Sequence, residues 1–145
     1  VVIDEADHIS RSGRIMESIR DFSDMGDIVF VIVGMGKIRD NLTAFPQVAS
    51  RIAQYVRFEH ATKDDVRAFY DTLCEVPVSD DLVGFTHQVT QGFNREIKEA
   101  LATVERVGKR NAAGPEKPVA LAHLAGQVLV NDRRTGAPIV VPGVL

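Results

Sequence analysis

The feature that most constrains the fold is the uninterrupted apolar run over residues 28–33, in which only Phe30 is not β-branched. β-branched residues favour strands, and a strand that is apolar on both faces is typical of the centre of a parallel sheet. The chain has 145 residues, of which 45% are hydrophobic and 26% are charged, values close to those of average globular domains. A chain of this size can bury a sizeable core, so we expect residues 28–33 to be covered on both faces.

Two other segments predict strands that accompany this run. Residues 1–3 are apolar and end in the acidic pair Asp4-Glu5, whereas residues 55–59 alternate between apolar and polar side chains. Apolar side chains at helical spacing predict helices between the strands, over residues 11–25, 37–44 and 47–53. Strands that alternate with helices predict an α/β fold with a parallel sheet.

After residue 60 the pattern becomes helical. Thr62 and Asp65 match the capping box at the start of a helix, and Ser79 and Asn94 are the expected N-caps of two more helices. A linker, a short helix and a small hairpin are predicted over residues 111–118, 118–125 and 128–141. We therefore predict three parts: an α/β core over residues 1–60, a helical region over residues 61–126 and a basic extension over residues 127–145.

Charge is unevenly distributed along the chain. Residues 1–103 carry 11 Lys/Arg and 17 Asp/Glu, whereas residues 104–145 carry 6 Lys/Arg and 3 Asp/Glu. A basic segment attracts the phosphates of nucleic acids, and the alternative is an ordinary solvated surface. The candidate phosphate contacts are Arg106, Lys109, Arg110, Arg133 and Arg134.

Cysteine, histidine and hydropathy patterns exclude several classes of protein. Cys74 is the single cysteine, so an internal disulfide and a thiolate zinc site are excluded. The histidines lack ligand spacing, and we expect no metal other than Mg²⁺. No apolar run approaches the roughly 18 residues that a membrane span needs. We expect a cytoplasmic protein without a signal peptide or a membrane partner.

Asp4 and Glu5 are the residues that most directly indicate a catalytic site. An acidic pair at the carboxyl end of a buried parallel strand lies where α/β sheets bind their ligands. In a phosphate-hydrolysing site, the first carboxylate helps to hold Mg²⁺ near the phosphates, and the second orients or deprotonates the attacking water. The alternative is an acidic turn that caps the following helix.

The segment Val1-Val2-Ile3-Asp4-Glu5-Ala6-Asp7-His8 resembles the Walker B segment of AAA+ ATPases. The resemblance continues through residues 28–34, 50–58 and 92–98, and it covers roughly residues 1–110. Residues 33–39 and 71–76 are most similar to the ATP-binding DNA transposition proteins of Mu-like phages and to related transposon target-selection ATPases. The resemblance implies a partial P-loop NTPase core, from Walker B onward, followed by an all-α lid.

The resemblance also implies roles for individual residues. Asp4 would lie beside Mg²⁺ and Glu5 would be the catalytic glutamate. Arg51 would be an arginine finger that reaches ATP in the neighbouring subunit, because a planar cation stabilises transition-state charge. Arg95 would be the second sensor, on a lid helix over the γ-phosphate. The alternatives are a helix-end Arg51 in a local contact and an ordinary exposed Arg95.

Two departures from the family pattern limit what this chain can do. Gly34-Met35-Gly36 replace the polar first sensor, and Lys37 is the candidate substitute. The sequence contains no Gly-x-x-x-x-Gly-Lys-Ser/Thr, the loop that holds a triphosphate. We therefore expect this chain alone neither to bind ATP well nor to hydrolyse it. We expect its open strand edges to rearrange, to pair with a second copy or to be covered by preceding residues.

The function implied by the resemblance is ATP-dependent self-assembly on double-stranded DNA and delivery of target DNA to a transposase. Other functions stay open. The region is alternatively a non-catalytic module that docks a partner protein, or part of a secretion or regulatory ATPase. The sequence Asp4-Glu5-Ala6-Asp7 also occurs in RNA helicases, but Gly34-Met35-Gly36 do not supply the small-hydroxyl motif that helicases place after the next strand.

Overall fold

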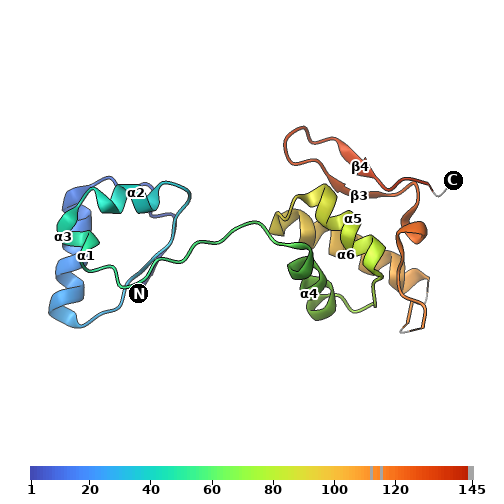
Figure 1. The fold of residues 1–145 in the computed structure, drawn as a ribbon, viewed down its shortest axis with the longest axis horizontal. Coiled ribbons are helices and arrows are strands. Elements are labelled where there is room, and N and C mark those ends of the chain that lie inside the picture. The colour runs from blue at the N-terminus through green and yellow to red at the C-terminus, as the bar shows by residue number, and fades with distance from the viewer. Residues whose placement is uncertain (112, 115, 144–145) are drawn as a thin grey trace. The chain divides into compact units, whose positions relative to one another are not determined.

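The computed structural model describes residues 1–111, 113–114 and 116–143. The chain is α/β and divides into two compact units, unit 1 over Val1–Arg57 and unit 2 over Phe58–Leu145. Both are drawn in Figure 1. Each unit has a buried cluster of its own, centred on Met16 in unit 1 and on side chains such as Tyr70 in unit 2.

Unit 1 is built around a parallel pair of short strands. β1 (Val2–Ile3) pairs with β2 (Val31–Ile32), with Val2 opposite Val31. Helix α1 (Gly13–Gly26) connects the two strands, because parallel strands need a crossover. Two short helices follow, α2 (Ile38–Thr43) and α3 (Pro46–Ala49). The predicted strand–helix–strand order and the predicted parallel sheet are confirmed.

The core of unit 1 is small. The Ser12 side chain caps α1 by accepting the backbone N–H of Ile15. On the inner face of this helix, Met16 is fully buried against Leu42 and Val48 from the two short helices. The partly buried side chains that pack on this cluster are Ile9, Ile19, Ile38, Phe45 and Ile52.

Two strand predictions for unit 1 are wrong. Residues 55–59 form no strand, and residues 28–33 are not covered on both faces, since Val29 is 77% exposed and Val31 is 50% exposed. The parallel sheet contains only β1 and β2 among the described residues. A strand needs a hydrogen-bonded neighbour, and a parallel strand needs a layer on each face. In the described part of unit 1, Val31 and Ile32 pair with β1, but the exposed side chains of Val29 and Val31 lack a covering layer.

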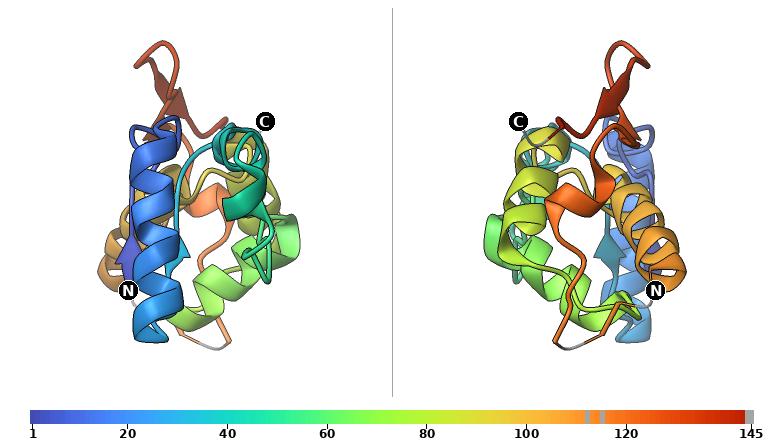
Figure 2. Two further views of the ribbon diagram at one scale, coloured as in Figure 1. Left: turned by 90° about the vertical axis from the view of Figure 1, so that its left-hand side faces the viewer. Right: turned by 90° about the vertical axis from the view of Figure 1, so that its right-hand side faces the viewer.

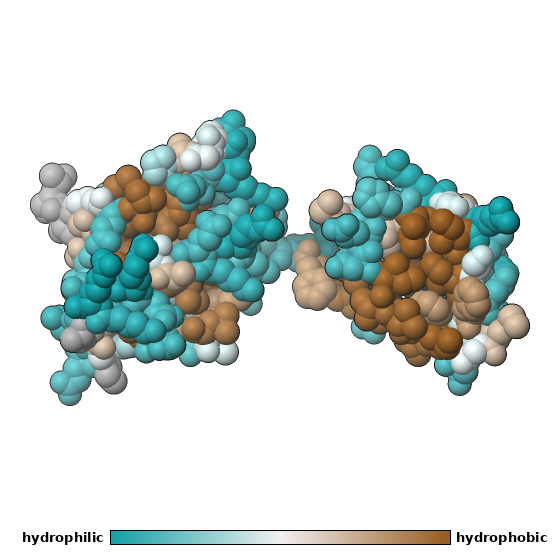
Figure 3. All heavy atoms as spheres, turned by 180° about the vertical axis from the view of Figure 1, so that it is seen from behind, coloured by the Kyte–Doolittle hydropathy of each residue, from teal (hydrophilic) through white to brown (hydrophobic). Residues whose placement is uncertain are grey.

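The uncovered strands leave unit 1 with a large apolar surface. In Figure 3, apolar side chains form a continuous area on the face of this unit that the view presents. Monomeric proteins rarely expose apolar patches of more than a few hundred Å². The exposed large apolar residues of unit 1 are Val1, Val2, Ile15, Phe22, Met25, Ile28, Val29, Val31, Val33, Met35, Tyr55 and Val56.

Unit 2 is a helical body with a hairpin packed on it. Its elements are α4 (Lys63–Leu73), α5 (Asp80–Thr90), α6 (Asn94–Arg110), the 3₁₀ helix η1 (Leu121–Leu124), and the antiparallel strands β3 (Val128–Asn131) and β4 (Pro138–Val140). The predicted helices and hairpin are confirmed. In Figure 2, η1 lies between α5 and α6, and the hairpin stands at one end of these helices. Among the described residues, no helix is both long and apolar enough to cross a membrane.

The hairpin shares the core of the helices. Leu129, Val130 and Val141 are buried in the same cluster as Leu82 and Val104. A register irregularity between β3 and β4 lets two successive residues of β3 face inward, which a regular strand does not allow. The described residues of the extension predicted over residues 127–145 therefore form one body with α4, α5 and α6.

Local sequence chemistry sets the helix ends in unit 2. The predicted capping box of α4 is confirmed: the backbone N–H of Asp65 donates to Thr62 Oγ1 (3.2 Å), and the backbone N–H of Thr62 donates to Asp65 Oδ2 (2.8 Å). Asn94 is not the N-cap of α6 as predicted. Phe93 occupies that position with an extended backbone, and its ring contacts His60, so the helix begins at Asn94, one residue earlier than an Asn94 cap predicts.

Candidate functional site

Asp4 and Glu5 follow β1 at its carboxyl end, and both side chains are exposed. The backbone N–H of Glu5 donates to Asp4 Oδ1 (2.8 Å). Glu5 has a φ of 52°, in the left-handed region that side chains other than glycine rarely adopt. Such a conformation costs on the order of 1 kcal/mol or more, and residues of this kind cluster at functional sites. The strand thus ends in a sharp change of direction at the predicted catalytic glutamate.

Asp7 fixes the turn after β2 beside this acidic pair. Its Oδ2 accepts the backbone N–H of Met35 (2.6 Å), and the backbone N–H of Ala6 donates to the carbonyl of Val33 (2.9 Å). A Cβ at Gly34 would lie 2.7 Å from Asp7 Oδ2, so a larger residue here would displace the Asp7 carboxylate. No role of its own was predicted for Asp7 from the sequence. The sequence does contain a signal for this role, because Asp7 follows one predicted strand and Gly34 follows the neighbouring one.

A buried polar contact connects the loop after β1 to α2. The Ser10 hydroxyl is fully buried, donates to the carbonyl of Asp7 (3.2 Å) and accepts from Asn41 Nδ2 (2.8 Å). Buried polar groups need such partners to offset the loss of water. The loop after β1, the turn after β2 and helix α2 are therefore held together by side-chain hydrogen bonds.

Lys37 and Arg51, the other predicted residues of unit 1, are both exposed. Lys37 lies at the N-cap of α2 and has no ion pair within the described residues. Arg51 Nη2 lies 3.1 Å from Asp24 Oδ2 at the end of α1. An exposed ion pair of this kind contributes about 1 kcal/mol or less, so Arg51 can exchange Asp24 for another anion at small cost.

Arg95 belongs to unit 2, in the first turn of α6, and its side chain is exposed. Together with Asn94, Lys98, Glu99 and Ala102, it lines a shallow open depression on the surface of the helix. Arg95 has no ion pair among the residues that the structure describes. It is therefore available to an anionic ligand on this face.

Two of the five predicted phosphate contacts have partners within unit 2. Lys109 pairs with Glu75 Oε2 (2.8 Å) and with Glu105, and these hydrogen bonds raise the pKa of Lys109 above its ordinary value. The Arg133 guanidinium lies 4.2 Å from the centre of the Phe93 ring, in a cation–π contact. Lys109 and Arg133 are thus engaged within unit 2, whereas Arg106, Arg110 and Arg134 have no ion pair among the described residues.

The contact between Arg133 and Glu96 ties the hairpin loop to α6. Arg133 Nε lies 3.8 Å from Glu96 Oε1, and Glu96 is 8% exposed. Glu96 Oε2 is buried without a hydrogen-bond partner in the described part of the chain. Removing the nearest cation from a buried carboxylate is costly, so Arg133 has a structural role in unit 2.

The arrangement fits the implied Mg²⁺ and ATP only in part. Mg²⁺ is usually held by one or two carboxylates together with phosphate oxygens, a role that exposed Asp4 can fill. The described residues contain no group of three or more His, Cys, Asp or Glu side chains that could hold a metal by itself. The sequence provides no loop to hold a triphosphate, so the residues present do not complete a nucleotide site.

Comparisons of this chain with protein-family models, with curated proteins and with solved structures found no match. The residues and their geometry are therefore the basis on which a function is proposed.

Proposed function

We propose that this chain is the C-terminal part of an AAA+ ATPase that acts in DNA transposition. The observation that carries the proposal is the acidic pair Asp4-Glu5 at the carboxyl end of β1, beside a turn of the neighbouring parallel strand that Asp7 fixes. This is the place where α/β sheets bind ligands. The resemblance to the Walker B segment gives the pair its proposed chemistry.

The proposed reaction is the attack of water on the γ-phosphoryl group of ATP, with ADP as the leaving group. Asp4 would hold the Mg²⁺ side of the site, and Glu5 would orient the water and take up its proton. Arg51 would leave Asp24 to stabilise negative charge in the neighbouring subunit, and Arg95 would contact the phosphates from the lid. Lys37 is the proposed substitute for the first sensor.

The remaining parts of the proposal concern assembly. The chain lacks its own phosphate loop, so hydrolysis requires residues that this sequence does not contain. ATP would be bound between the subunits of a self-assembled oligomer on double-stranded DNA in the cytoplasm. The oligomer would deliver its target DNA to a transposase.

The test is ATP hydrolysis by the full-length protein that contains this chain, with and without double-stranded DNA. We expect DNA to stimulate turnover and Glu5→Gln to lower it at least 100-fold, because the water loses its base. Glu116→Gln, which removes an exposed carboxylate from unit 2, is the matched control and should keep turnover. Equal turnover in wild type and Glu5→Gln would reduce the acidic pair to a structural turn.

A second candidate function is a non-catalytic module that docks a partner protein. The exposed apolar face of unit 1 favours it, because large apolar patches mark interaction surfaces. Absence of turnover under every condition, together with retained binding to a transposase, would support this function over the ATPase.

A further inference from the structure

The exposed face of α6 carries a row of basic side chains that the proposed ATPase chemistry does not use. Lys98, Ala102, Arg106 and Arg110 are spaced four residues apart, so they lie along one side of the helix. We call these four residues the α6 basic row. At a rise of 1.5 Å per residue, the row is about 18 Å long. All four residues are exposed, whereas Ile97, Val104 and Val107 on the opposite side are buried.

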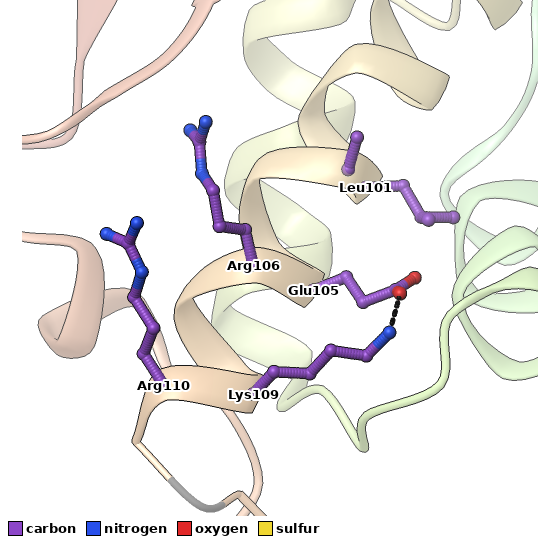
Figure 4. A pocket seen from close by; sticks show the side chains of 6 residues that line it. Leu101, Glu105, Arg106, Lys109 and Arg110 are labelled. Carbon is purple, nitrogen blue, oxygen red and sulfur yellow. Dashed lines mark hydrogen bonds and ion pairs between the residues drawn. The ribbon is translucent and has the colours of Figure 1, made fainter.

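The three cations of the row are available to a ligand. None of them has an ion pair among the described residues, in contrast to Lys109 and Arg133. In Figure 4, Arg106 and Arg110 extend from the same side of α6, while Lys109 and Glu105 pair on another side. Arg106 and Arg110 therefore present two guanidinium groups next to each other, one helical turn apart.

Ala102 leaves room for a ligand in the middle of the row. Two shallow open depressions meet at this residue: one includes Lys98 in its lining, and the other includes Arg106 and Arg110. A small side chain here lets a ligand approach the helix closely between the flanking cations. Glu99 is the one acidic side chain that lines the depressions without an ion pair within the described residues, so positive charge prevails along the row.

The chemistry of the row favours a phosphate backbone over a protein surface. Protein interfaces are centred on buried aromatic and aliphatic anchors, and the row offers only the methyl group of Ala102. Phosphate oxygens are bound by Arg and Lys, and the planar guanidinium matches them with two parallel hydrogen bonds. We propose that the α6 basic row binds the phosphate backbone of double-stranded DNA.

This inference deepens the proposed function, on which it rests for the choice of DNA as the partner. The row differs from the set of DNA contacts predicted from the sequence. Lys98 is added to it, whereas Lys109 and Arg133 are left out because both have partners within unit 2. Arg95 is left out of the row, since it is the proposed second sensor. A variant of the row therefore leaves the proposed nucleotide chemistry unchanged.

The test measures binding of the 145-residue chain to a short fluorescent DNA duplex by anisotropy at several salt concentrations. The row variant combines Lys98→Gln, Arg106→Gln and Arg110→Gln. The control combines Arg14→Gln, Lys63→Gln and Lys117→Gln, which remove the same charge from exposed positions elsewhere. We expect the row variant to bind at least 10-fold more weakly, with a salt slope smaller by about 3, while the control keeps the wild-type slope.

Three results would overturn the inference. An unchanged salt slope in the row variant, with a reduced slope in Arg134→Gln, would place the DNA contact at the hairpin loop. If the row variant lost binding to polyglutamate but bound DNA as the wild type does, the row would bind an acidic protein partner. No binding of wild-type chain to DNA would reject the inference, while the Glu5→Gln comparison of ATP hydrolysis would still test the ATPase proposal separately.

Discussion

The Tyr70 hydroxyl lies in the core of unit 2, 2.9 Å from Thr86 Oγ1. Burial raises the pKa of Tyr70 to about 12, because the phenolate loses its hydration there. In the unfolded chain the pKa is about 10. A group with a higher pKa in the folded state gives its full stabilisation below the unfolded pKa and loses it as pH rises further. Between these two values, stability therefore falls with pH.

The first prediction concerns this tyrosine. We expect the free energy of unfolding to fall by up to about 1.4 kcal/mol per pH unit between about pH 10 and pH 12. Tyr70→Phe should remove most of this decrease, and at neutral pH it should cost about 1–2 kcal/mol because Thr86 loses its partner. Urea unfolding followed by circular dichroism at several pH values measures both effects. If the free energy of unfolding fell equally at alkaline pH in both proteins, Tyr70 would not be the group responsible.

At the scale of elements, helices and strands differ in how much of their structure comes from nearby sequence. The capping box of α4 joins residues only three positions apart, and local bonds of this kind form wherever the helix forms. The turn between α5 and α6 needs a distant segment as well. Gly92 has a φ of 76°, and its carbonyl accepts the backbone N–H of Ala61 at 2.9 Å.

The second prediction concerns this turn. A Cβ at Gly92 would lie 2.3 Å from the carbonyl oxygen of Ala61, so Gly92→Ala must displace the backbone. We expect it to destabilise unit 2 by about 2 kcal/mol or more. The control is Gly84→Ala inside α5, where the nearest atom would be Lys63 Cε at 3.7 Å, an ordinary contact. This variant should be stabilised by about 0.5–1 kcal/mol, as helix propensity dictates.

Urea unfolding of the two alanine variants beside the wild type checks this prediction. If Gly92→Ala were as stable as the wild type, the close approach of Gly92 to Ala61 would not exist in solution.

At the scale of the whole molecule, the two units differ in how well they cover their apolar side chains. Unit 2 buries a contiguous cluster that runs from α4 to the hairpin, whereas the buried cluster of unit 1 has Met16, Leu42 and Val48. The strands of unit 1 are uncovered, and exposed strand edges with apolar side chains pair with other chains. Unit 1 is therefore the part of this chain that most needs a partner.

The third prediction follows from this surface. We expect the 145-residue chain to self-associate as its concentration rises, and Val29→Lys combined with Met35→Lys to reduce the association. Leu73→Lys is the control, since Leu73 is an exposed apolar residue of unit 2. Light scattering coupled to size-exclusion chromatography measures the mass. A monomer at every concentration, or equal association in all three proteins, would exclude unit 1 as the contact.

Sequence alone predicted the order of the helices and of the hairpin, together with local features such as the start of α4. Apolar periodicity fixes the face that a helix buries, and caps such as Thr62 act within one turn, so both can be read locally. The acidic pair Asp4-Glu5 was likewise predictable at the end of its strand. The contacts of Asp7, Lys109 and Arg133 were not, because their partners lie far away in the chain or depend on side-chain direction.

Only the tertiary structure decided which predicted strands pair and which basic residues are available. Residues 55–59 have the alternation of a strand, yet a strand exists only where another backbone accepts its hydrogen bonds. Residues 28–33 have the composition of a buried strand, yet burial depends on what else is present to cover them. Composition indicates whether a segment is able to form a strand or to be buried, but pairing and burial require neighbouring segments that the rest of the molecule supplies.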